Sequence, residues 1–176
     1  MFNKILVAID RSPVGKYVFT AALSLAKVSG AKLMLLHVLS PYEEDYPYAP
    51  LIEPLNYLAG KFDDSLDKYL EKLEKFKQEG LDLLNSYTKE ALNMGINTEF
   101  MQIPGNPGHV ICEVATNNNA DLIVIGYRGH SPWQELLLGS VSNYVSHHAK
   151  CSVFTVHSDN TSQLTINNEQ LTINNE

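Results

Sequence analysis

The chain has 176 residues, which is enough for one domain that buries its own core without disulfides or metal ions. Its 13 Lys and Arg residues against 20 Asp and Glu residues give a net charge of −7, and no basic stripe offsets it, which argues against a nucleic-acid partner. The sequence shows no secretion-type leader and no apolar run near the roughly 20 residues of a membrane span, and its two cysteines lie far apart. We therefore expect a soluble, cytoplasmic protein with no membrane partner.

The N-terminal part predicts a strand, a helix and a second strand. Residues 3–10 (NKILVAID) are apolar and rich in β-formers. A helix is expected from near Ser12 and Pro13 to near Gly30, because proline favours the first helical turn and glycine the position after the last. Residues 32–40 (KLMLLHVLS) are almost continuously apolar, which is typical of a buried parallel strand. We expect His37, within this strand, to be a hydrogen-bonded core residue.

The middle of the chain predicts an irregular segment and then a long helix. Residues 41–60 are dense in Pro and Tyr and show no regular period. From about Phe62 to Met94, apolar residues recur near helical spacing with Lys and Glu between them, which predicts an amphipathic helix. Gly80 is the point at which this helix is expected to bend or to be interrupted.

The remaining elements complete an alternating pattern. A strand is expected at 96–103, a turn and helix at 105–120, a strand at 121–126, a helix at 141–149 and a strand at 151–157. Strands that alternate with helices favour a parallel sheet with helices on both faces. The prediction is an α/β fold, a single doubly wound domain around a five-stranded sheet.

The C-terminal tail departs from this pattern. QLTINNE at 163–169 is repeated without change at 170–176. A seven-residue unit copied once is too short for a solenoid, and its Asn-rich composition offers little apolar surface to bury. We predict a domain over residues 1–158 and a disordered extension over 159–176.

The stretch GYRGHSPWQELLLGS, residues 126–140, is the strongest indication of a binding site. Gly126 ends the fourth predicted strand, at the sheet edge where open α/β folds bind ligands. Gly129 lets the chain turn, and Gly139 and Ser140 precede a helix, where free backbone N–H groups favour an anion. The spacing predicts a phosphate cradle, but it contains neither a Walker A lysine nor a G-x-G-x-x-G motif. Taken singly, each of these residues is better explained as a strand end or a helix cap.

The spacing G-x2-G-x9-G-S, the first strand ending ILVAID and the LLHV of the second strand together resemble the universal stress protein family, in its ATP-binding branch. The resemblance covers residues 3–157. It implies a five-stranded parallel sheet, an adenine nucleotide at the carboxyl edge of the sheet, and dimerisation. Carried onto this chain, the family's nucleotide-binding positions fall on Asp10, Val38, Gly126, Gly129, Gly139 and Ser140. Arg128, which lies between two of the site glycines, and Val141, which follows Ser140, complete the predicted set.

The two charged residues of this set, Asp10 and Arg128, also have possible roles that involve no nucleotide. Asp10 either caps the first helix or faces the phosphates through Mg²⁺ or Mn²⁺, since a carboxylate near polyphosphate needs a cation between them. Arg128 faces either phosphate or solvent. No His, Cys and Asp cluster has the spacing of a metal site, so a structural zinc is not expected, and Cys112 and Cys151 are expected to be buried, unreactive thiols.

Three functions remain open at this point. The first is a stress-response regulatory protein that binds ATP with at most slow hydrolysis, because the sequence shows no Walker lysine and no base beyond Asp10. The second is an adenine-nucleotide hydrolase or transferase on the same sheet, and the third is an interaction protein with an idle pocket. Because a glycine cradle binds phosphate more than base, the motif is compatible with ATP, ADP, AMP or a cyclic dinucleotide.

The last predicted strand also bears on assembly. In a sheet of strand order 3-2-1-4-5, residues 151–157 form an edge with unpaired backbone groups. The family resemblance implies that this edge pairs with its counterpart in a second copy around a two-fold axis. We therefore expect a homodimer through the strand at 151–157.

Overall fold

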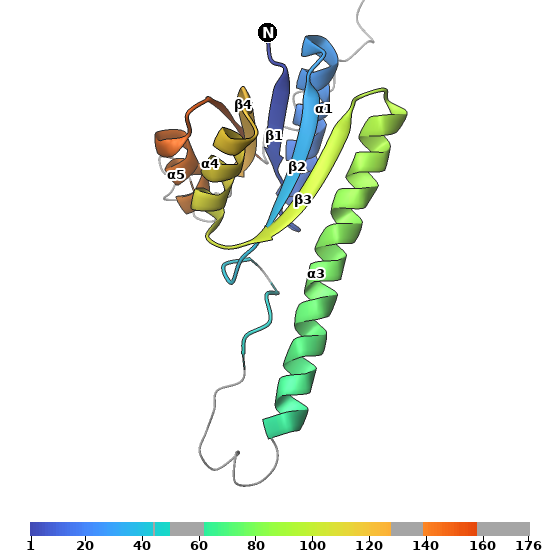
Figure 1. Ribbon diagram of the computed structural model, residues 1–176, viewed down its shortest axis with the longest axis vertical. Coiled ribbons are helices and arrows are strands. Elements are labelled where there is room, and N and C mark those ends of the chain that lie inside the picture. Colours follow the sequence, from blue (N-terminus) through green and yellow to red (C-terminus); the bar gives the residue numbers. More distant parts are fainter. Residues whose placement is uncertain (44, 50–61, 128–138, 158–176) are drawn as a thin grey trace, which may run out of the picture.

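A computed structural model describes residues 1–43, 45–49, 62–127 and 139–157, with the backbone alone for residues 62–64. Five parallel strands form one sheet in the order β3-β2-β1-β4-β5, which confirms the predicted fold and strand order (Figure 1). The strands are β1 (Lys4–Ala8), β2 (Lys32–Leu39), β3 (Thr98–Pro104), β4 (Leu122–Tyr127) and β5 (Ser152–His157).

The helices are α1 (Pro13–Ser29), α3 (Phe62–Asn93), α4 (Pro107–Asn117) and α5 (Ser140–His148). Helices α1 and α3 cover one face of the sheet, and α4 and α5 cover the other (Figure 1). Helix α1 begins as predicted with Pro13 in its first turn and ends at Gly30, which adopts a left-handed conformation with φ 71°. Glycine enters that conformation without the steric cost of a side chain.

The core consists of two layers, one on each face of the sheet. In β1, Ile5 and Val7 belong to the cluster beneath α1 and α3, whereas Leu6 belongs to the cluster beneath α4 and α5. Successive side chains of a strand point to opposite faces, so a strand covered on both sides must be apolar throughout. Full burial of each such side chain contributes about 1.5 to 3 kcal/mol, which makes the sheet a rigid support for groups at its edges.

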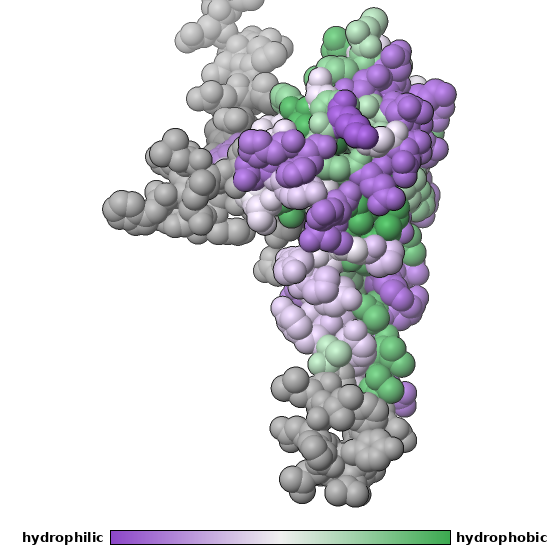
Figure 2. Space-filling model, turned by 60° about the vertical axis from the view of Figure 1, so that its left-hand side comes forward, coloured by the Kyte–Doolittle hydropathy of each residue, from purple (hydrophilic) through white to green (hydrophobic). Residues whose placement is uncertain are grey.

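Helix α3 is continuous from Phe62 to Asn93, so the expected interruption at Gly80 was wrong. A Cβ atom on Gly80 would lie 2.4 Å from Gln102 Nε2 and 2.5 Å from His37 Nδ1. The glycine therefore serves close packing of the helix against the sheet. The N-terminal half of α3 extends beyond the carboxyl edge of the sheet (Figure 1). Hydrophobic residues are exposed along this projection (Figure 2), where the Leu70 side chain is half exposed.

Residues 50–60 of the Pro- and Tyr-rich segment and the repeated tail at 159–176 lie outside the described residues. The division into a domain and a disordered tail therefore stays a prediction. Within the described ranges, no helix has the length and apolar character required to cross a membrane.

Candidate functional site

A cavity of about 320 Å³ opens at the carboxyl ends of β1, β2 and β4, next to the start of α5. Six of the eight predicted site residues line it, namely Asp10, Val38, Gly126, Gly139, Ser140 and Val141. The other two, Arg128 and Gly129, lie outside the described residues. The parallel sheet thus brings together residues that are far apart in sequence, because the strands that carry or precede them all end at the same edge.

The Asp10 carboxylate belongs to this lining and follows the end of β1. Its Oδ1 accepts hydrogen bonds from the Ser12 hydroxyl at 2.5 Å and from the Ser12 backbone N–H at 3.1 Å. Asp10 therefore holds the turn that leads into α1 and faces the cavity as well. Gly15 allows α1 to start this close, since a Cβ atom there would lie 2.4 Å from the Asp10 carbonyl oxygen.

The N-terminus of α5 forms one end of the cavity. Its first intrahelical hydrogen bond runs from Asn143 N–H to Gly139 O at 2.8 Å, so the N–H groups of residues 140–142 precede the helical ladder. Within the described residues, the exposed Ser140 hydroxyl has no hydrogen-bond partner. N–H groups that precede the helical ladder, the helix dipole and a hydroxyl together favour an anion.

Gly139 and Gly126, the two glycines at this end of the cavity, differ in what their surroundings require. Gly139 has φ −52° and ψ 152°, a conformation open to any residue, so its backbone does not require glycine. A Cβ atom on Gly126 would lie 2.9 Å from Val14 Cγ1. Gly126 therefore lets α1 pack against β4, and it also lines the cavity.

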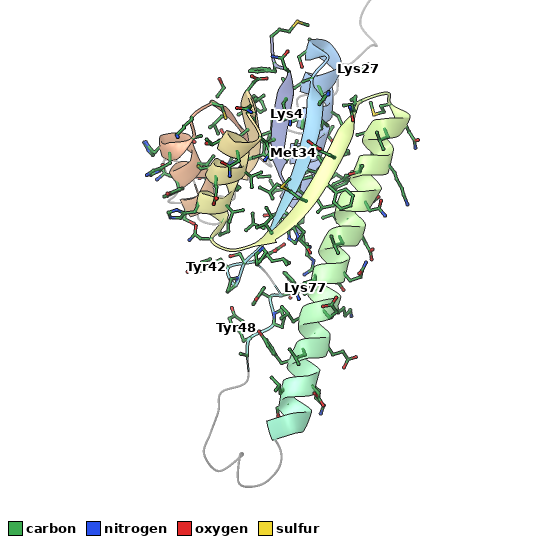
Figure 3. The ribbon with its side chains drawn as sticks, viewed as in Figure 1. Lys4, Lys27, Met34, Tyr42, Tyr48 and Lys77 are labelled. Carbon is green, nitrogen blue, oxygen red and sulfur yellow. The ribbon has the colours of Figure 1, made fainter. Side chains whose placement is uncertain are left out.

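The opposite end of the cavity is formed by residues just after β2. Most of them belong to the segment that the sequence analysis predicted to be irregular. Ser40, Tyr42 and Glu43 all line the cavity, and Tyr42 lies beyond the end of β2 with its ring largely exposed (Figure 3). The turn is closed by a hydrogen bond from Glu43 N–H to Ser40 O at 3.0 Å. The Ser-Pro pair at 40–41 is a turn signal, but no periodic pattern marks Glu43 as a site residue.

Glu43 is a buried carboxylate with three described hydrogen-bond contacts. Its Oε1 accepts from the Arg11 backbone N–H at 3.0 Å, and its two oxygens lie 3.0 and 2.9 Å from His37 Nε2. His37 is 1% exposed, which confirms the expected hydrogen-bonded core histidine. Buried carboxylates are stable only when such partners compensate their charge.

The chemistry available in the described lining is restricted. It contains two carboxylates, Asp10 and Glu43, and no Lys or Arg side chain. Within the described ranges, no cluster of three or more His, Cys, Asp or Glu side chains is placed to hold a metal ion. Cys112 and Cys151 are half-buried rather than fully buried, and burial raises the pKa of both thiols, which favours their protonated form.

Comparisons with known proteins identify relatives over nearly the whole described chain. The model of the universal stress protein family matches residues 1–157. Universal stress protein YxiE of Bacillus subtilis is 35% identical over 156 residues, which are 89% of this chain and 99% of that protein.

Two solved structures share the fold. A universal stress protein in complex with cAMP is 26% identical and superposes with a TM-score of 0.58, covering 89% of this chain and 97% of that one. A universal stress protein family protein from Arabidopsis thaliana with AMP bound is 22% identical, with a TM-score of 0.55 and coverage of 88% and 91%.

Proposed function

Because the chain belongs to the universal stress protein family, we propose that it is a stress-response protein that binds an adenine nucleotide, ATP in particular, in the cavity at the carboxyl edge of its sheet. One observation carries the proposal: the cavity joins an apolar end beside Val38 to an anion-favouring end at the start of α5. A nucleotide has the same polarity, with a flat apolar base at one end and phosphates at the other. The cAMP and AMP bound to the two relatives support this assignment.

The lining suggests how a nucleotide would lie. Phosphates would bind the N–H groups of residues 140–142 and the Ser140 hydroxyl, as anions do at helix N-termini. The base would then lie between Val38 and the turn at 40–43, and the ribose near Asp10. Arg128 and Gly129 are proposed to complete the phosphate end.

Asp10 is the described residue that would hold Mg²⁺ or Mn²⁺ together with phosphate oxygens. Mg²⁺ in nucleotide sites uses one or two carboxylates plus phosphates and water. Of the two carboxylates in the described lining, Glu43 is held by Arg11 and His37, so Asp10 is the one that fits this requirement. The cation would neutralise charge between the Asp10 carboxylate and the phosphates.

We expect a regulator rather than an efficient enzyme. Phosphoryl transfer needs positive charge at the transferred group and a residue that orients the nucleophile. Both carboxylates of the described lining are already engaged, Asp10 with Ser12 and Glu43 with His37, so the described lining offers no separate base for the second task. Incubation of purified protein with labelled ATP separates this proposal from a hydrolase or transferase, for which steady turnover is expected.

The direct test of the proposed ligand is mass spectrometry of small molecules released from purified, denatured protein. We expect an adenine nucleotide in near-stoichiometric amount, or its stoichiometric uptake when ATP and Mg²⁺ are added. A protein that releases and takes up no adenine nucleotide would contradict the proposal.

We also propose a homodimer through β5. This strand is an edge of the sheet, and the Phe154 ring is 45% exposed on it, whereas Val153 and Val156 pack partly against the two core layers. Among the described residues β5 pairs only with β4, and an edge strand that carries exposed apolar side chains favours pairing with another chain.

Phe154→Glu tests this interface with the least damage to the core. We expect light scattering after size exclusion to show a dimer for the wild type and for the control Phe154→Leu, and a folded monomer for Phe154→Glu. A monomeric wild type, or a charged variant that stays dimeric, would refute the β5 interface.

A further inference from the structure

A chain of buried and partly buried polar groups connects the cavity to α3, and we call it the Glu43 network. It consists of the Glu43 carboxylate, the His37 ring, the Gln102 amide and the Lys77 carbonyl of α3. Figure 3 shows Lys77 on the part of α3 near the carboxyl edge of the sheet. Of these four residues, only Glu43 lines the cavity.

The direction of each hydrogen bond follows from the Lys77 carbonyl. That oxygen can only accept, so the Gln102 amide must present its NH₂ group to it, at 3.0 Å. The same nitrogen lies 2.9 Å from His37 Nδ1, which therefore accepts. His37 Nε2 must then carry the proton that is donated to Glu43. The α3 backbone thus fixes the tautomer that holds the Glu43 carboxylate.

A second connection between α3 and the cavity runs through Arg11. Its backbone N–H donates to Glu43, while its guanidinium pairs with Glu79 and lies 4.5 Å above the centre of the Phe76 ring, both on α3. The Tyr46 ring packs edge-on against Phe76 at 5.3 Å. One turn of α3, residues 76–80, therefore contacts both the residue after Asp10 and the segment after Glu43.

We propose that this turn of α3 positions the wall of the ligand cavity at residues 40–43, so that His37, Gln102 and Gly80 are positioning residues for the ligand although none of them lines the cavity. Gly80 is essential to this arrangement, because any side chain there would meet the His37 ring and the Gln102 amide. The expected effect on ligand affinity rests on the proposed nucleotide function. The positioning of residues 40–43 by α3 is independent of which ligand binds.

Gly80→Ala is the decisive variant. Alanine favours the interior of a helix over glycine, so the helix itself gains stability, while the new methyl group displaces the Glu43 network. We expect the affinity for ATP with Mg²⁺ to fall about 10-fold, within the usual range for coupling between sites. Gln102→Leu removes the polar connection without the added bulk and is expected to act in the same direction.

Two controls on the same helix separate positioning from general loosening. Leu84→Val disturbs the fully buried contact of α3 one turn further along, and Ser86→Ala raises helix propensity at an exposed position. Both are expected to keep ATP affinity within about twofold of the wild type, since they lie outside the network. An equal loss of affinity in Leu84→Val, at a matched fall in Tm, would overturn the proposal.

Amide hydrogen exchange at Arg11 tests the wall without any nucleotide. Its N–H donates to Glu43, so Gly80→Ala and Gln102→Leu should both accelerate its exchange in the ligand-free protein, and Ser86→Ala should not. Unchanged exchange in both network variants would overturn the proposal. If the wild type bound no nucleotide, the proposed function would fail, and exchange at Arg11 would still decide whether α3 holds the wall.

Discussion

The two edges of the sheet use carboxylates in opposite ways. At the amino edge, the Asp121 side chain accepts hydrogen bonds from the backbone N–H groups of Asn3 at 2.6 Å and Lys4 at 2.9 Å. At the carboxyl edge, Asp10 and Glu43 are also hydrogen-bonded, but both face a cavity. The carboxylate at the amino edge links two neighbouring strands. The carboxylates at the carboxyl edge hold turns and also line an open space.

This difference follows from the geometry of parallel strands. At the amino edge, Asp121 precedes β4 and accepts hydrogen bonds from backbone N–H groups at the start of the neighbouring β1. At the carboxyl edge, the chain leaves β1 toward one face of the sheet and leaves β4 toward the other. The two connections diverge, so they do not cover the strand ends between them. Changes at the carboxyl edge should therefore alter binding, and changes at the amino edge should alter stability.

The largest effect is expected from Gly139→Val. A β-branched side chain at the start of α5 occupies the approach of the phosphates, while φ −52° lets valine keep the local backbone. We expect a loss of ATP affinity of roughly 100-fold or more, about 2.7 kcal/mol, with a circular dichroism spectrum like that of the wild type. Unchanged affinity in the folded variant would remove the main support for a phosphate site at α5.

Ser140→Ala removes one hydrogen-bond donor to a charged group. The expected loss of binding free energy is about 1.5 to 3 kcal/mol, measured by calorimetric titration with ATP. Ser146→Ala, on the same helix, is the matched control, because its described hydrogen bond lies within α5, to Ser142 O at 2.8 Å. If the two variants bound equally well, the Ser140 hydroxyl would have no role at the ligand.

Asp10→Asn separates a role in metal binding from a role in the turn before α1. An amide keeps an oxygen that can accept from Ser12, but it lacks the charge that a cation would bridge. We expect affinity for ATP to fall about 10-fold with Mg²⁺ present and little without it. Equal losses in both titrations would mean that Asp10 only shapes the turn.

The smallest effect on binding is expected at the amino edge, from Asp121→Asn. Hydrogen bonds from the N–H groups of Lys4 and Asn3 hold the Asp121 pKa below its usual 3.8. The folded state therefore favours the ionised form, and this stabilisation is present above the ordinary pKa and lost as pH falls through the lower, folded value.

Melting curves across pH check this sign. The wild type should exceed Asp121→Asn in Tm at neutral pH, and the difference should shrink as the solution is acidified below pH 3.8. ATP affinity at neutral pH should be the same in both proteins. A difference in Tm that does not depend on pH, or a loss of affinity, would contradict the separation of the two edges.

Most of the fold could be predicted because the strands and helices are marked by residues within or next to each element. Strand β2 is nearly all apolar, and Gly30 ends α1 in the conformation that glycine favours. Asp10, Val38 and Gly126 could be placed near one another because each lies at or just beyond the end of a parallel strand, and parallel strands end at the same edge.

The remaining features depend on contacts that no local pattern reveals. Glu43 lies in a segment without a period, and its burial depends on His37 and Arg11. The sequence suggested a break at Gly80, whereas the structure uses it for close approach to His37 and Gln102. In both cases, partners distant along the chain determine the role of the residue.

Isothermal titration of ATP with Mg²⁺ into the wild type, Gly139→Val and Asp121→Asn tests the central claim most directly. If the carboxyl-edge cavity is the nucleotide site, the wild type and Asp121→Asn bind one ATP per chain with equal affinity, and Gly139→Val shows no measurable heat of binding. A wild type that binds no ATP, or a folded Gly139→Val that binds it as well as the wild type, would contradict the account.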